Sequence, residues 1–487
     1  MDAHASQTNG RYRRLLNNER KFLFTPMACI GVVARLHGHL SEAEVRLAID
    51  KVRVVHPQAA VRVTMDYDWS AWFHTDNVPE IPLRVVERRT DDQWFEELRH
   101  EQQTAFDPFT GPLLRFVLLK SLDASDLVAF AQHSICDGTG LAYLTRDVLL
   151  HLGNPQTDAR PLPLPPRLSP ENLPDGVREN QLARFARRLY SRRLNNKWRQ
   201  EPFIFDMDDF RAIHDAFLGT YTYCVQTVEL SLSETEALIA ICRSQNVSVN
   251  SASTTAFIEA YTHCVGPLEE RRRKVAVPVD MRKRLGRQVG DVLDLYVGTV
   301  MFDFRYDVHK SFWDNARVFD RTAHKKMESL ECFEVMYQME DMDGSLMDAL
   351  LGFGTMSQLV PPGTSKYEKL SAFTQDRDNA VNQLAERFMK ALPGVINTNL
   401  ANMDFPRRYG DFELERMFFA PATGPQYPLV LGVITTSGRL TLTLNYMEEA
   451  TGSPTMAAIR ERAVALLGLS ANAAVPRDRS PMENVPR

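Results

Sequence analysis

The residues best suited to chemistry lie together between positions 127 and 140. An apolar run begins at Leu127 and ends at His133, and Asp137 and Gly138 follow after a polar turn. An imidazole at the end of a strand can face a cleft, where its near-neutral basicity lets it take a proton from an attacking hydroxyl or amine. Glycine permits a backbone angle that other residues avoid. The pattern H-x-x-x-D-G therefore predicts that His133 is a general base on a turn shaped by Asp137 and Gly138.

The complete pattern is more specific than its parts. The chain has 12 histidines, 62 acidic residues and 24 glycines in 487 positions. Chance alone yields about 1.5 copies of H-x-x-x-[DE], but only about 0.08 once glycine must follow. Two other interpretations stay open: His133 could stabilise a turn, or Cys136 could form a Cys–His dyad with it, although a small buried thiol in a tight turn is far commoner.

Other common sites are not indicated by the sequence. His37 and His39 form a lone H-x-H without the companions that zinc needs. Asp341 and Asp343 lack the remaining ligands of a calcium loop. No GxxxxGK[ST] loop, G-x-G-x-x-G or G-x-S-x-G motif occurs. We therefore expect no metal, no nucleotide cofactor and no hydrolase triad.

Composition predicts a folded chain of two or three domains. Hydrophobic residues make up 44% and charged residues 24%, which is close to the globular average. The net charge of -5 argues against a chain built to bind nucleic acid. No stretch approaches the ~18 apolar residues of a membrane span, and no apolar signal core precedes position 24. The 6 cysteines are scattered without a C-x-x-C pair, so we expect a cytoplasmic protein with reduced thiols.

The order of elements predicts a mixed α/β fold. A strand over 29–36 is followed by a helix that Ser41 and Glu44 cap, and the second half opens similarly with Ser233 and Glu236. The stretches 40–49 and 232–241 share L-S-E-x-E-x-x-x-A-I, which either records a duplication or reflects recurrent capping chemistry. The motif itself is expected between a strand at 127–132 and a helix at 139–151.

A proline-rich stretch divides the chain. Seven prolines between 154 and 174 favour an extended crossing rather than a helix. We therefore expect an N-terminal lobe at 1–153, a linker at 154–176, and a C-terminal lobe at 177–487 that ends in a flexible tail. The stretch 177–200 is strongly basic, and Leu182, Phe185 and Leu189 fall on one face of the predicted helix. It could dock an acidic partner or a phosphate, or be a solvated face whose stems cover the domain below.

The H-x-x-x-D-G strand end resembles the superfamily of chloramphenicol-acetyltransferase-like acyltransferases. That superfamily includes nonribosomal-peptide condensation domains, plant BAHD acyltransferases, and polyketide-associated and alcohol acyltransferases. Other segments are similar to condensation-domain motifs: A-F-D-P at 105–108 with G-P-L-L-R at 111–115, V-D-M-R at 279–282 with Y-V-G at 296–298, and N-T-N-L at 397–400. The resemblance covers about residues 15 to 467.

The resemblance implies two lobes, each a mixed β-sheet flanked by helices, with the active-site channel between them and His133 at its middle. It also implies direct transfer, in which His133 takes the acceptor's proton. Asp137 would pair with Arg282, and Thr398 or Asn399 would stabilise the oxyanion. The donor would be a thioester on coenzyme A or on the phosphopantetheine of an acyl or peptidyl carrier protein, with no permanently bound cofactor.

Two departures from the family patterns narrow the expected reaction. Peptide-forming condensation domains usually have a second histidine where this chain has Gln132, and the plant-type DFGWG signature is absent, with only D-F-E at 411–413. We therefore expect an acyltransferase that forms an ester with an alcohol in secondary-metabolite or lipid biosynthesis. A free-standing condensation enzyme that forms an amide with an amine, and a catalytically silent carrier-docking module, are the alternatives. Donor docking is expected at a basic group: Arg184, Arg187, Arg188, Arg192 and Arg193.

Overall fold

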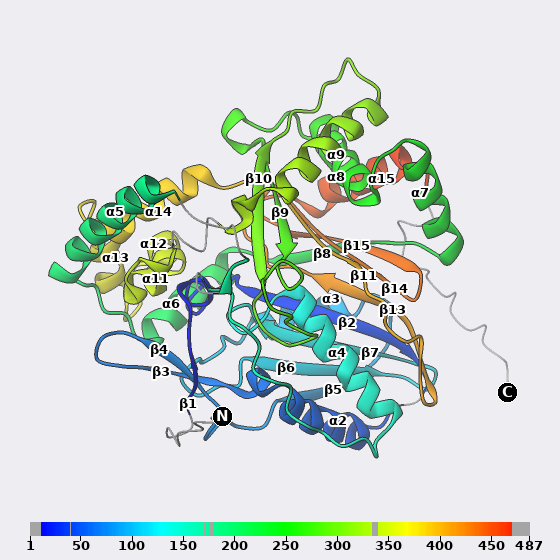
Figure 1. The fold of residues 1–487 in the computed structure, drawn as a ribbon, viewed down its shortest axis with the longest axis horizontal. Coiled ribbons are helices and arrows are strands. Elements are labelled where there is room, and N and C mark those ends of the chain that lie inside the picture. Colours follow the sequence, from blue (N-terminus) through cyan, green and yellow to red (C-terminus); the bar gives the residue numbers. More distant parts are fainter. Residues whose placement is uncertain (1–10, 39, 170–171, 175–179, 334–338, 470–487) are drawn as a thin grey trace.

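Two mixed six-stranded sheets form the centre of the chain (Figure 1). The structure is a computed structural model that describes residues 11–38, 40–169, 172–174, 180–333 and 339–469. The expected α/β class, with two mixed sheets flanked by helices, is confirmed. The predicted flexible tail falls on 470–487 and lies outside the described residues.

The N-terminal sheet places the H-x-x-x-D-G motif at the end of a central strand, β7. β7 is buried from Ser125 to Gln132 between β2 and β6, as its apolar sequence predicts. In spatial order the strands are β12 (Arg408–Tyr409), β13 (Phe412–Ala420), β2 (Cys29–His37), β7 (Ala124–Gln132), β6 (Leu114–Lys120) and β5 (Leu83–Glu87). The helices packed on this sheet are α3 (Trp94–Gln102) and α4 (Gly138–Gly153), and α2 (Glu42–Val55) packs against α4.

The C-terminal sheet is covered by its own helices. Its strands β9, β11 and β14 run parallel, and its remaining neighbours pair antiparallel. In spatial order they are β10 (Val297–Asp303), β9 (Lys274–Asp280), β11 (Val395–Asn402), β14 (Leu429–Thr436), β15 (Arg439–Met447) and β8 (Tyr223–Glu229). The helices that pack on it or on one another are α7 (Leu232–Ser244), α8 (Val249–Cys264), α9 (Phe312–Glu328) and α15 (Ser453–Leu466).

Strand β13 joins the two sheets, although it comes from the half of the chain expected to form the C-terminal lobe. Its backbone pairs with β2 in the N-terminal sheet, whereas β12 covers only the start of its other edge. Buried threonines of β14 and β15 take the place of the missing strand. Thr436 Oγ1 accepts from the Met417 amide at 2.8 Å, and Thr441 and Thr443 donate to the carbonyls of Met417 and Phe419 at 2.5 and 2.6 Å. These bonds satisfy buried backbone groups that would otherwise be costly.

A group of helices and a small sheet complete the fold at the left of Figure 1. The sheet is β1 (Arg11–Arg14), β4 (Ala71–His74) and β3 (Arg62–Met65). The helices are α1 (Asn17–Arg20), α5 (Gln181–Gln200), α6 (Met207–Thr220), α11 (Gly344–Leu351), α12 (Phe353–Met356), α13 (Tyr367–Gln375) and α14 (Ala380–Ala391). Residues 154–169 carry neither helix nor strand, as their prolines predict.

The helix caps follow the sequence in one half and depart from it in the other. Ser41 and Glu44 form the predicted capping box of α2. The predicted Ser233–Glu236 cap is wrong, because Ser231 caps α7 with Glu234 as its partner. The stretch S-L-S-E-T-E holds two overlapping boxes, and the earlier one is used, directly after a fully buried leucine at 230. The shared L-S-E stretch therefore does not align the two helix starts.

Replacing Gly432 with alanine tests how closely β13 lies against the C-terminal sheet. An added Cβ would lie 2.4 Å from the Phe419 carbonyl oxygen and 2.6 Å from Thr443 Oγ1, so Gly432→Ala should lower the free energy of unfolding by about 1–3 kcal/mol. Gly219→Ala is the matched control, since nothing lies within 4 Å of the new Cβ and alanine favours a helix. Urea denaturation of both variants checks this, and equal stabilities would contradict it.

Candidate active site

His133 is the one point at which solvent reaches the motif. From Ser125 to Ala142 every residue is buried except His133. Its amide donates to the Ala28 carbonyl at 2.9 Å, which prolongs the β2–β7 pairing by one step. The strand therefore carries the imidazole out of the core while the following turn returns to it.

The surroundings of the ring determine its tautomer. Nδ1 lies 2.8 Å from the Cys136 carbonyl oxygen, and because a carbonyl only accepts, the proton must be on Nδ1. Nε2 then keeps a lone pair. The Phe22 ring stacks on the imidazole at 4.3 Å between centroids, with 5° between the planes. His133 is thus held by its edge and by one face, with its basic nitrogen available.

Electrostatics keep the imidazole neutral near pH 7. Burial lowers the pKa of His133, and the Lys21 ammonium lowers it further, while the Cys136 carbonyl and Asp137 act in the opposite direction. Together these effects lower the pKa of His133 below its ordinary value of 6.5. Lys21 itself lies 4.7 Å from the Phe22 centroid, and burial lowers the pKa of Lys21 to about 8. A neutral imidazole is the form that can accept a proton.

Asp137 binds both lobes rather than the histidine. It is the N-cap of α4, and its Oδ1 accepts from the Gly140 amide at 2.7 Å. Its Oδ2 accepts from Arg282 Nη1 at 2.9 Å and from the Tyr296 amide at 2.7 Å. The family resemblance implies this pairing with Arg282, and both side chains are buried. The carboxylate therefore connects the motif turn to two segments of the C-terminal half.

Arg282 completes this junction from the end of β9. Its Nη2 donates to the Asp294 carbonyl at 3.0 Å and to the Val292 carbonyl at 3.3 Å. Gly140 permits the close approach, because an added Cβ there would lie 2.9 Å from Arg282 Nη2. The Asp294 carbonyl also accepts from the Asp137 amide at 3.3 Å. One arginine thus holds the start of α4 against the loop before β10.

A second buried network extends from Asp294 to the ring that stacks on His133. Arg13 Nη2 lies 2.7 Å from both Asp294 Oδ1 and Glu19 Oε1. Glu19 belongs to α1, which ends just before Phe22. Burial raises the pKa of Asp294 to about 6. None of these four residues was identified from the sequence, although the charged cluster at 11–20 was a visible signal.

Gly138 is where strand β11 meets the motif. A Cβ at Gly138 would lie 2.6 Å from the Phe419 ring and 3.0 Å from Leu400 Cδ2, so glycine is needed for packing. Leu400 directly follows the expected oxyanion residues. Asn399 donates to Asn250 Oδ1 at 2.9 Å and accepts from the Ala401 amide at 2.7 Å. The Thr398 side chain on the same strand is half-buried.

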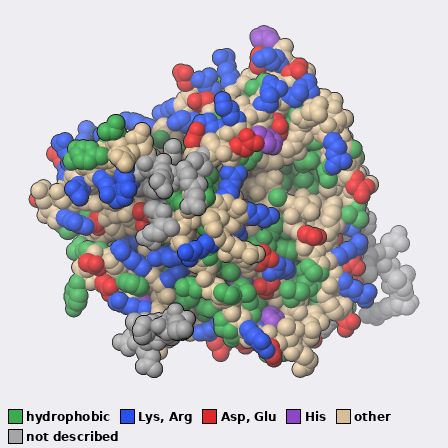
Figure 2. All heavy atoms as spheres, viewed as in Figure 1, with side chains coloured by type: hydrophobic (Ala, Val, Ile, Leu, Met, Phe, Trp, Pro, Cys, Tyr) green, Lys and Arg blue, Asp and Glu red, His purple; other side chains and the backbone are tan. Residues whose placement is uncertain are grey.

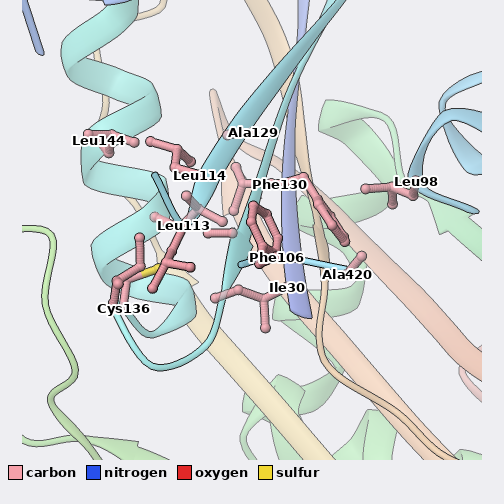
Figure 3. Packing of buried hydrophobic residues seen from close by; sticks show 14 of the residues in the cluster. Ile30, Leu98, Phe106, Leu113, Leu114, Ala129, Phe130, Cys136, Leu144 and Ala420 are labelled. Atoms are coloured by element: carbon pink, nitrogen blue, oxygen red, sulfur yellow. The ribbon is translucent and has the colours of Figure 1, made fainter. Parts of the chain in front are cut away.

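The thiol of Cys136 is buried in the apolar core, and the side-chain amide of Gln132 is hydrogen-bonded. Burial raises the pKa of the Cys136 thiol well above its usual value, and Figure 3 shows its side chain near Leu113 at the start of α4. Gln132 donates to the Phe22 carbonyl at 2.5 Å and accepts from the Ser134 amide at 2.8 Å. Neither group is therefore presented as a second base or as a nucleophile.

Solved structures with a similar fold cover almost the whole chain. Polyketide synthase associated protein 5 from Mycobacterium tuberculosis has 16% identity and a TM-score of 0.55 over 94% of this chain and 98% of that one. The first condensation domain of the CDA synthetase has 13% identity and a TM-score of 0.55 over 96% of this chain and 98% of that one. The trichothecene 15-O-acetyltransferase TRI3 from Fusarium sporotrichioides has 12% identity and a TM-score of 0.60 over 95% of this chain and 97% of that one. No family model and no curated protein sequence matches.

The protein has the chloramphenicol-acetyltransferase-like fold. The resemblance inferred from H-x-x-x-D-G is confirmed at the level of the fold. The described residues contain no group of three or more His, Cys, Asp or Glu that could hold a metal ion. No described helix is long and apolar enough to cross a membrane.

The arginines expected to dock a donor lie on α5, away from the motif in sequence and on a separate group of helices (Figure 1). Arg187 pairs with Asp341, and Arg188 Nε lies 3.9 Å from the same carboxylate. The other three, Arg184, Arg192 and Arg193, are exposed. Leu182, Phe185 and Leu189 are also exposed, so this face of α5 does not cover a domain below it.

Removing the Asp137 carboxylate tests the junction between the lobes. Asp137→Ala removes the buried counter-charge of Arg282, which keeps only the partly exposed Asp280 carboxylate at 3.2 Å, and leaves the Tyr296 amide without a partner. We therefore expect a loss of about 3–5 kcal/mol in the free energy of unfolding. Glu386→Gln, in an exposed pair with Lys390, should change it by less than about 1 kcal/mol. Chemical denaturation measures both, and a loss below 1 kcal/mol for Asp137→Ala would contradict the assignment.

Proposed function

We propose that the protein transfers an acyl group from a thioester directly to an alcohol, with His133 as general base. The observation that carries the proposal is the hydrogen bond from His133 Nδ1 to the Cys136 carbonyl, which leaves Nε2 as the basic atom. His133 is also the one residue of the motif that is not buried. A neutral imidazole in that position can take the proton of a hydroxyl as the hydroxyl attacks.

The proposed step balances without an acyl-enzyme. The acceptor oxygen attacks the thioester carbonyl carbon while Nε2 of His133 takes the hydroxyl proton. The tetrahedral intermediate then collapses, the C–S bond breaks, and the imidazolium returns the proton to the departing thiolate, so the products are an ester and a thiol. Thr398, Asn399 or nearby backbone N–H groups are proposed to stabilise the oxyanion.

An alcohol acceptor is proposed because Gln132 occupies the position where peptide-forming condensation domains usually have a second histidine. Its side-chain amide is hydrogen-bonded to the Phe22 carbonyl and the Ser134 amide. One structural neighbour is named as a 15-O-acetyltransferase, which acts on oxygen. Amide formation and a catalytically silent docking role are the alternatives. Assays with matched alcohol and amine acceptors distinguish ester formation from amide formation. Product analysis by mass spectrometry with acyl-coenzyme A and acyl-carrier-protein donors tests whether the protein is catalytically silent.

Loss of the imidazole should abolish transfer while the fold is retained. In His133→Ala we expect kcat to fall by about 10²–10⁴-fold, because the general base is lost. The fold should be retained, because the side chain makes only one hydrogen bond to a backbone carbonyl and one ring contact among the described residues. His309→Ala, at an exposed position, is the matched control. Thermal unfolding checks that both variants fold. Normal turnover by folded His133→Ala would refute the mechanism.

The pH profile should follow the His133 environment. Since the neutral ring is active, kcat/KM should rise with pH and level off, with a midpoint below 6.5 because the pKa of His133 is lowered. Lys21→Met removes a neighbouring positive charge, so the pKa of His133 and the midpoint should move upward. Lys390→Met, on an exposed helix face, should leave the midpoint unchanged. An unchanged midpoint in Lys21→Met would contradict this account of the site.

A further inference from the structure

Helix α5 is attached to the protein by one face of its C-terminal half. Ser191, Leu194 and Trp198 are its buried residues, and they recur at the three- and four-residue spacing of a single helix face. Trp198 Nε1 donates to Ser345 Oγ at 2.8 Å, and Asn195 Oδ1 accepts from the Asp343 amide at 2.8 Å. These contacts hold the helix at a defined orientation.

The opposite face of α5 carries large apolar side chains into solvent. Leu182, Phe185 and Leu189 are 79%, 69% and 61% exposed. They also follow a three- and four-residue spacing, and the helical period of 3.6 places them about half a turn away from Ser191, Leu194 and Trp198. An apolar stripe this exposed on an anchored helix is costly unless something covers it.

Basic side chains accompany the apolar stripe on both sides. Arg188 and Arg192 project along one side of it, and Arg193 and Lys197 along the other, as the helical period requires. The 20 residues of α5 include no acidic residue. Figure 2 shows hydrophobic and basic side chains together at the left end of the molecule, where Figure 1 places α5. The stripe and its cations form a single surface, which we call the α5 ridge.

We propose that the α5 ridge binds the surface of a membrane that contains anionic lipids. A helix with Leu and Phe on one face and Arg beside them is the pattern that lies in the headgroup region, with its apolar side chains inserted and its cations at the lipid phosphates. Helix α5 lies at the periphery of the molecule (Figure 1). A fluid membrane surface accommodates a single exposed helix directly, whereas a protein partner would need a matching groove.

Lipid binding would not depend on the proposed acyl transfer, and it can be measured without any turnover. The ridge makes two separable contributions. Insertion of Leu182, Phe185 and Leu189 supplies the apolar term, while the arginines supply an attraction that requires anionic lipid and weakens with salt. Both contributions are needed, because neither alone holds a protein firmly on a bilayer.

Vesicle co-sedimentation of the full-length protein tests the proposal. The probes are phosphatidylcholine vesicles with and without phosphatidylglycerol, at low and high salt. We expect binding only to the phosphatidylglycerol vesicles, with at least about a tenfold loss of partitioning in Leu182→Ser/Phe185→Ser/Leu189→Ser and in Arg188→Gln/Arg192→Gln/Arg193→Gln. Leu122→Ser and Arg89→Gln, at exposed sites elsewhere, should bind like the parent. Because all altered side chains are exposed, the variants should fold, which circular dichroism checks.

Three results would overturn the proposal. One is equal binding of the apolar variant and the parent protein to phosphatidylglycerol vesicles. Another is equal binding of the parent to both kinds of vesicle. The third is failure of the parent to bind either kind of vesicle. If an acidic acyl carrier protein then binds in a salt-sensitive way that the arginine variant loses, the ridge is assigned to carrier docking instead.

Discussion

A buried ion pair between Asp137 and Arg282 is the constraint on which the candidate site depends. It joins the first residue before α4 to the end of β9 and to the loop that precedes β10. In a low-dielectric interior a buried charge needs a partner, and Arg282 is the charged partner of Asp137, while the more exposed Asp280 also pairs with Arg282. The turn that returns from His133 to the core is therefore held by both lobes at once, and the imidazole keeps its place only while they stay together.

The N-terminal segment supports the same site from the other side. Arg13 binds the carboxylates of both Glu19 and Asp294, the Asp294 carbonyl also accepts from the Asp137 amide, and the chain leads from Glu19 to the Phe22 ring against His133. Three segments distant in sequence thus converge on one ring. The imidazole has its edge contact from the Cys136 carbonyl of its own turn and its face contact from the distant Phe22, without a carboxylate, which fits a neutral base better than a charged one.

The local elements around His133 could be predicted from the sequence, and their partners could not. An apolar run that ends at His133, followed by a polar turn with Asp137 and Gly138, is enough to predict β7 and the helix after it, because both signals are local. Phe22 and Asp294 reach the site through long-range contacts that leave no periodic signal. The spacing of Leu182 and Phe185 predicted an amphipathic helix correctly, but the same spacing arises whether the apolar face meets a core or solvent, so its direction needed the structure.

The exchange of β13 between the sheets makes each half of the chain incomplete by itself. If the backbone were severed within 154–169, the first fragment would keep β2 but lose the strand beside it, and an unpaired sheet edge invites aggregation. The second fragment would carry a strand whose partner had gone, with Thr441 and Thr443 still bound to it. The two pieces would therefore have to fold together, which makes this linker a natural position for dividing the protein into complementing fragments.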